Sequence, residues 1–151
     1  MLYDYNITLL EKNSFVSLSE LEWLGLERCG IRTIELGAFN GLTMLMDLYI
    51  GQNEISEIIP GTFQNIISLT VLDLKSNRIE HLDRNVFSGL FKLKYIYLSQ
   101  NKLQFLHPDT FSGLPNLEHL YFTTIPAFIF QLTAISLNHI LYYILIYHVA
   151  T

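Results

Sequence analysis

The amino-acid sequence predicts an α/β solenoid, in which similar coils place their strands side by side in one curved parallel sheet of about five strands. Two observations predict it. Apolar residues recur every 24 residues, and one short segment of each repeat alternates apolar with polar residues. A third observation limits the solenoid: residues 119–151 contain no Asp, Glu, Lys or Arg, although the chain of 151 residues has 14 acidic and 9 basic residues.

The repeats divide the chain into successive units. Four full copies begin at Leu21, Leu45, Leu69 and Leu93, with a partial copy before them and a truncated copy after them. The predicted boundaries are therefore 1–20 (partial repeat), 21–44, 45–68, 69–92, 93–116, 117–124 (truncated repeat) and 125–151 (uncharged apolar tail). A fixed period of 20–29 residues indicates a solenoid, because stacked units bury an apolar face that one unit cannot bury alone.

Each copy opens with a predicted strand. In the second copy Leu48 and Ile50 are expected to point inward, and Asp47, Tyr49 and Gly51 outward, since successive side chains of a strand alternate between its two faces. A polar column follows the strand, where a buried amide can pair with backbone groups of adjacent turns. This structural turn ladder consists of Cys29, Asn53, Asn77 and Asn101.

The second half of each copy is predicted to form the opposite, convex side. A phenylalanine recurs there and is expected to stack as a structural spine of Phe39, Phe63, Phe87 and Phe111. Pro60 and Pro108 occupy one column just before it, and proline interrupts a long helix. The convex connections are therefore expected to be irregular or short 3₁₀ turns.

The repeated pattern resembles the signature L-x-x-L-x-L-x-x-N/C-x-L of the leucine-rich repeat family. The resemblance implies a right-handed superhelix and non-catalytic protein recognition. The 24-residue length and the central Phe resemble the extracellular animal subtype found in Toll-like, Slit-like and hormone receptors. An extracellular or membrane-associated location is therefore expected, and cysteine at position 29 is tolerated in the ladder.

The outward strand positions, called the concave face below, are the candidate surface for a protein or peptide ligand. Tyr and Trp are enriched at protein interfaces because they bury large areas at low entropic cost. The alternative interpretation is that tyrosine simply suits parallel strands. The candidate ligand-binding residues are Trp23, Glu27, Asp47, Tyr49, Asp73, Lys75, Tyr95, Tyr97, His119 and Tyr121.

Charge and motifs exclude several function classes. The net charge of −5 and the scattered basic residues argue against a nucleic-acid partner, which requires clustered Lys and Arg. The sequence contains no catalytic motif, no metal-ligand spacing and no phosphate loop, so no enzyme activity, cofactor or metal is expected. Asn6 begins the triplet Asn-Ile-Thr, which accepts a glycan in secreted proteins.

The tail allows three interpretations. Residues 127–150 are long and apolar enough for a transmembrane helix, which would associate the chain with a membrane. They could also form a helix packed on the last repeat, or be a non-native extension. The first residues lack the pattern of a signal peptide, so we expect an upstream region to be missing. The alternatives to ligand recognition are a structural or matrix-type scaffold, homophilic or receptor-complex association, and a truncated fragment without independent function.

Overall fold

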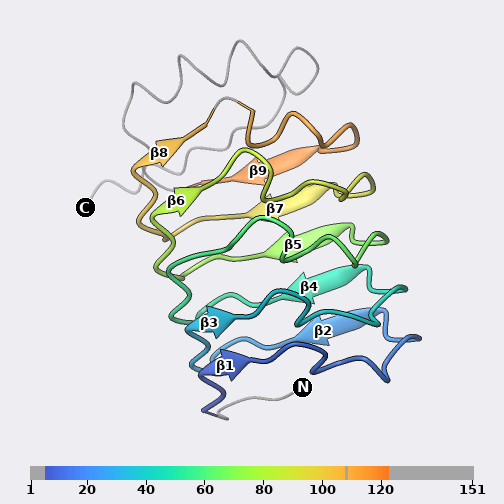
Figure 1. Cartoon of the computed structure of the whole chain (residues 1–151). Helices are drawn as coiled ribbons and strands as arrows, with labels where there is room; N and C mark the ends of the chain where they lie inside the picture. Colours follow the sequence, from blue (N-terminus) through green and yellow to red (C-terminus); the bar gives the residue numbers. More distant parts are fainter. Residues whose placement is uncertain (1–5, 108, 123–151) are drawn as a thin grey trace.

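The computed structural model describes residues 6–107 and 109–122, except the side chain of Phe105. The described residues form nine short strands in three parallel sheets (Figure 1). The main sheet has the order β2-β4-β5-β7-β9. Its strands are β2 (Trp23–Gly25), β4 (Asp47–Tyr49), β5 (Val71–Asp73), β7 (Tyr95–Tyr97) and β9 (His119–Tyr121).

The register of the main sheet follows the sequence period. Trp23 pairs with Asp47, Asp47 with Val71, and Val71 with Tyr95, each 24 residues further along the chain. The strands therefore stack one above another in chain order, as Figure 1 shows. The predicted solenoid with a parallel sheet of five strands is confirmed.

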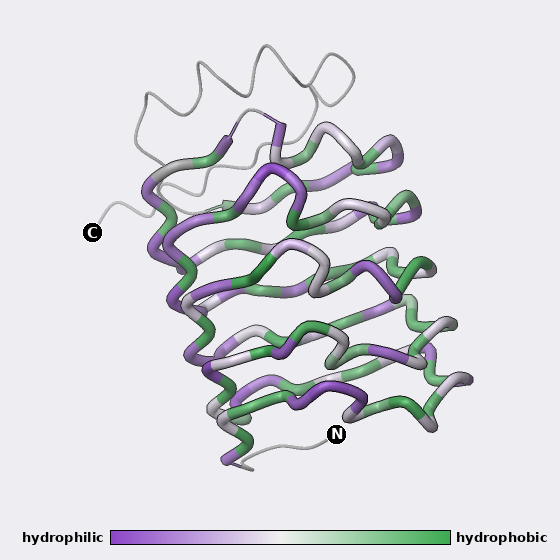
Figure 2. The backbone as a smooth tube through the Cα atoms, in the orientation of Figure 1, coloured by the Kyte–Doolittle hydropathy of each residue, from purple (hydrophilic) through white to green (hydrophobic). Residues whose placement is uncertain are grey.

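The core lies between the main sheet and the convex side. The inward strand residues are buried, and Leu48 and Ile50 have no exposed surface. Figure 2 shows apolar and polar stretches alternating along each coil of the backbone. The apolar columns of successive coils merge into one continuous core, because each coil packs mainly on its two neighbours.

The convex side consists of turns joined by bonds from an amide to the carbonyl three residues earlier, such as Ala38 N–H to Glu35 O (3.0 Å). These turns match the irregular connections predicted, and none in the described residues extends into a 3₁₀ helix. Four two-residue strands that also lie outside the main sheet were not expected from the sequence. They pair as β1 (Leu9–Leu10) with β3 (Thr33–Ile34), and β6 (His81–Leu82) with β8 (Phe105–Leu106).

These two small sheets are separated at the second full repeat, where residues 56–59 form no strand. A cleft of about 470 Å³ opens between this segment and β3. Its lining mixes the basic Lys12 and Arg32 with the acidic Glu35 and Glu57. The cleft therefore has no dominant charge.

The phenylalanine column forms a continuous stack beneath the convex turns. The ring centroids of Phe39 and Phe63 are 6.0 Å apart, those of Phe63 and Phe87 are 6.3 Å apart, and those of Phe87 and Phe111 are 5.7 Å apart. Phe15 extends the stack into the partial first repeat, at 6.1 Å from Phe39. The spine ties the repeats together, since each ring contacts the equivalent ring of the next coil.

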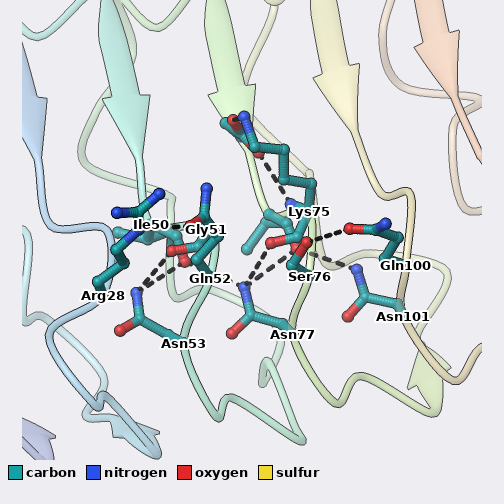
Figure 3. Close-up of polar contacts among 12 residues, drawn as sticks. Arg28, Ile50, Gly51, Gln52, Asn53, Lys75, Ser76, Asn77, Gln100 and Asn101 are labelled. Carbon is teal, nitrogen blue, oxygen red and sulfur yellow. Dashed lines mark hydrogen bonds and ion pairs between the residues drawn. The ribbon is translucent and has the colours of Figure 1, made fainter.

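Asparagine side chains join neighbouring coils at the point where the backbone of each coil leaves its strand in the main sheet (Figure 3). The Asn53 Oδ1 atom accepts the N–H groups of Cys29 (3.0 Å) and Ile31 (3.1 Å), and its Nδ2 donates to the Leu26 carbonyl (2.8 Å). Asn77 and Asn101 make equivalent bonds one and two coils further on. Buried backbone groups that no strand can pair are satisfied in this way.

The predicted tail, residues 125–151, lies outside the described residues, and so do residues 123 and 124 of the truncated repeat. Within the part of the chain that is described, no helix has both the length and the apolar character to cross a membrane.

Candidate functional site

The concave face carries half-buried side chains along the outer surface of the main sheet. Tyr95, Tyr97, His119 and Tyr121 are each partly accessible, as are Asp47 and Tyr49. Trp23 is 36% exposed, which is the largest accessible fraction among the aromatic residues of this face. All these side chains point outward because successive residues of a strand alternate between its two faces, which turns every second side chain away from the core.

The C-terminal half of this face is an aromatic platform. The rings of Tyr95 and His119 stack with centroids 4.8 Å apart and planes inclined by 5°, and those of Tyr97 and Tyr121 stack at 4.6 Å and 6°. His119 and Tyr121 are 6.1 Å apart along β9. The register of β7 with β9 sets both stacks, because it places Tyr95 opposite His119 and Tyr97 opposite Tyr121. We call these four residues the aromatic platform.

The N-terminal half of this face combines the rings of Trp23 and Tyr49 with the carboxylates of Glu27 and Asp47, and we call these four residues the corner. The Trp23 ring lies 5.8 Å from the Tyr49 ring, tilted by 40°. It lies across Gly25, since a Cβ at position 25 would be 2.4 Å from Cη2 of Trp23. No role of this glycine was expected from the sequence. A glycine at an outward strand position two residues from a tryptophan is the signal that could have revealed the close approach.

Asp73 is a correction to the predicted ligand-binding set. Although it occupies an outward strand position, it is only 2% exposed. Its Oδ1 atom accepts the backbone N–H of Lys75 (2.8 Å), and its Oδ2 atom is 2.9 Å from Lys75 Nζ. The register also places it between Tyr49 and Tyr97. Because buried charge must be paired, this carboxylate is committed to Lys75 and is not open to a ligand.

Two tyrosines of the face are harder to ionise than usual. Burial is the largest cause that raises the pKa of the Tyr49 phenol, followed by the charges of Asp47, Asp73 and Glu27. Burial also raises the pKa of Tyr97, where neighbouring tyrosines and Asp73 add to it. Both phenols therefore remain neutral hydrogen-bond donors at physiological pH.

The remaining predicted residues lie away from this face or support it. Cys29 and the three ladder asparagines are structural, and Asn6 is exposed. No group of three His, Cys, Asp or Glu side chains in the described residues is arranged to hold a metal ion.

Two further features of the structure were not expected from the sequence. One column has left-handed backbone angles in four successive coils, with φ between 54° and 58° at Arg28, Gln52, Ser76 and Gln100. None of these four residues is β-branched, as expected at positions with positive φ, where β-branched side chains are strongly disfavoured. This absence is the signal by which the sequence could have revealed the left-handed column. The other feature is a pair of exposed apolar side chains in equivalent positions, Ile67 (57%) and Phe91 (62%), where Thr43 and Pro115 occupy the same column.

Comparison with known families agrees with this architecture. A family model described as leucine rich repeat matches residues 19–79 and 67–123. The chain belongs to the leucine-rich repeat family. No curated protein matches the sequence significantly.

This leucine-rich repeat chain is similar to several solved structures. The APL1 leucine-rich repeat domain superposes with a TM-score of 0.75 at 25% identity, over 83% of this chain and 38% of that one. TLR13, in complex with ssRNA13, gives 0.71 at 34% identity, over 80% and 18%. The LRIM1/APL1C complex gives 0.74 at 26% identity, over 80% and 26%. The chain thus spans well under half the length of each of these structures.

Leucine-rich repeat domains are typically non-enzymatic modules that bind proteins.

Proposed function

We propose that this protein is a non-catalytic recognition module that holds a protein or peptide partner on its concave face. The aromatic platform carries the proposal. Two stacked ring pairs, Tyr95 with His119 and Tyr97 with Tyr121, present half-exposed rings held in place by neighbouring strands. Such rings bury large area with little loss of side-chain entropy, which is why aromatic residues dominate interface energies.

A protein partner is favoured over a nucleic acid by charge. One solved relative is a complex of two leucine-rich repeat proteins, LRIM1 and APL1C, whereas TLR13 was solved with an RNA. The described part of the concave face carries the acidic Glu27 and Asp47 and one lysine, Lys75, which is paired with Asp73. RNA binding requires clustered positive charge. We therefore do not propose an RNA ligand for this chain, although TLR13 was solved with one.

The experiment is affinity capture with the full chain as bait in detergent extracts, followed by titration of each captured protein after purification. We expect a saturable partner whose affinity falls at least about tenfold in a Tyr97→Ala, Tyr121→Ala double variant, as for loss of interface anchors. Phe91→Ser is the matched control, because it removes an exposed ring outside the concave face. Equal binding by the double variant and the control would contradict the proposal.

A structural scaffold is the second candidate function. Ile67 and Phe91 expose apolar side chains outside the concave face, and exposed apolar surface favours self-association. In that case the chain would associate with itself. Light scattering would show a concentration-dependent mass that Ile67→Ser and Phe91→Ser abolish and Tyr97→Ala leaves unchanged.

The proposal includes an extracellular or membrane-associated location, which rests on the resemblance of the 24-residue repeat to the extracellular animal subtype. Asn6 is exposed and can accept a glycan there. Treatment with a glycosidase should shift the mass of the expressed chain but not that of an Asn6→Gln variant, and carbonate extraction should leave membrane-inserted chain in the pellet. A chain that carries no glycan and is fully extracted by carbonate would argue for another location.

A further inference from the structure

We infer that the corner formed by Trp23, Tyr49, Glu27 and Asp47 receives an arginine or lysine side chain of the partner. This inference rests on the proposed function and names the chemistry of its partner. The partner segment would lie along the concave face with its apolar part on the aromatic platform and its cation at the corner.

The aromatic geometry of the corner suits a cation. Trp23 and Tyr49 are tilted by 40° with centroids 5.8 Å apart, so the two ring faces are not closed against each other as in the stacked pairs of the platform. Trp23 also remains 36% exposed. A guanidinium or ammonium group within about 6 Å of a ring centroid is attracted to the ring face, and tryptophan binds it best.

Neither carboxylate of the corner forms an ion pair with a lysine, arginine or histidine of the described residues. The Oε2 atom of Glu27 is buried and has no hydrogen-bond partner in the described residues. Asp47 is half-buried, and its Oδ1 atom accepts a long hydrogen bond (3.3 Å) from the Thr70 hydroxyl. A buried carboxylate oxygen without a partner is costly, and a donor supplied by a ligand would remove that cost.

The two nearby cations make their side-chain contacts with other residues of the described chain. Lys75 pairs with Asp73 at 2.9 Å, and Arg28 donates through Nε to the Gln52 side chain at 2.6 Å. Burial is the largest cause that raises the pKa of Tyr49; the charges of Asp47, Asp73 and Glu27 raise it further, and the charge of Lys75 opposes them, so these carboxylates act on one point of the face. Since neither Glu27 nor Asp47 forms an ion pair within the described residues, the corner presents two carboxylates beside an aromatic surface, and charge complementarity favours a basic partner.

The single tryptophan of the chain provides a direct probe, because Trp23 lies in the corner. The full chain is titrated with synthetic Gly-Ser nonapeptides that carry Arg, Lys, Gln or Glu at the same three positions. We expect saturable changes in Trp23 fluorescence with the Arg and Lys peptides, weakened at high salt, and none with the Gln or Glu peptides. Labelled peptides followed by anisotropy repeat the measurement without depending on tryptophan.

Charge variants locate the site. We expect Glu27→Gln and Asp47→Asn each to weaken the Arg peptide at least about threefold, as for loss of one partly exposed charge pair. Glu80→Gln is the matched control, since it removes the same charge from an exposed residue just before β6, outside the main sheet. Circular dichroism checks that each variant is folded.

Three results would overturn the inference: equal binding of the Gln peptide, no saturable binding of the Arg peptide, or equal weakening by Glu80→Gln. The proposed function is judged separately. A captured partner that depends on Tyr97 and Tyr121 but not on Glu27 and Asp47 would retain recognition by the concave face and reject a basic partner.

Discussion

The Nδ2 atom of Asn77 donates a hydrogen bond of 3.0 Å to the backbone carbonyl of Ile50, 27 residues earlier and one coil below. The same amide group donates to Leu74 O (3.0 Å) in its own coil and accepts from Ile55 N–H (3.1 Å). Each asparagine of the turn ladder thus joins two coils through backbone groups that strand pairing leaves over.

Asn77→Ala is expected to destabilise the fold by about 2 kcal/mol or more, because it leaves the buried Ile55 N–H without a partner. Asn65→Ala is the control. Its side chain is exposed and bonds only another side chain, Asn40 (2.6 Å), so its cost should stay within about 0.5 kcal/mol. Urea denaturation followed by circular dichroism measures both, and equal costs would contradict the ladder's role.

Phe63→Ala should cost about 3–5 kcal/mol, because the ring is fully buried between Phe39 and Phe87. Phe91→Ala makes the same chemical change at a ring that is 62% exposed, and should change stability little. The comparison uses the midpoint of thermal unfolding. A similar shift for both variants would mean that the spine contributes nothing beyond ordinary surface contact.

Gly41→Ala should destabilise the protein more than Gly89→Ala, although both glycines have nearly the same left-handed φ, 91° and 89°. Left-handed backbone alone costs an alanine about 1–2 kcal/mol. At Gly41 a Cβ would also lie 2.5 Å from the Val16 carbonyl oxygen, whereas at Gly89 the nearest atom is 3.9 Å away. Denaturant titrations of the two variants test the difference, and equal losses would show that the backbone at Val16 moves freely.

Tyr49 should ionise above its ordinary pKa of 10.0 in the folded protein. Because the folded pKa is raised, its contribution to stability is complete below pH 10 and is lost as the pH rises through the folded value. The difference in absorbance at 295 nm between the native protein and Tyr49→Phe gives its titration. Removing the charge of Asp47 should lower the midpoint only in part, since burial is the largest cause. A midpoint at or below 10 would contradict the buried setting.

The placement of side chains could be predicted from the sequence better than their accessibility. The 24-residue period places Leu48 and Ile50 in the core and stacks Phe63 on its neighbours, because a solenoid in strict register converts sequence spacing directly into contact. It did not predict the two-residue strands such as Thr33–Ile34, whose alternation is too short to stand out from the surrounding turns.

The sequence by itself determined that this chain is a leucine-rich repeat solenoid and which residues face outward from the sheet, because strand alternation and the repeat length leave no other way to bury the leucines. Only the tertiary structure decided which outward residues a partner can reach. Asp73 is buried against Lys75, and Trp23 lies across Gly25 toward Tyr49. Side-chain accessibility depends on the rotamers of neighbours one coil away, and periodicity carries no information about them.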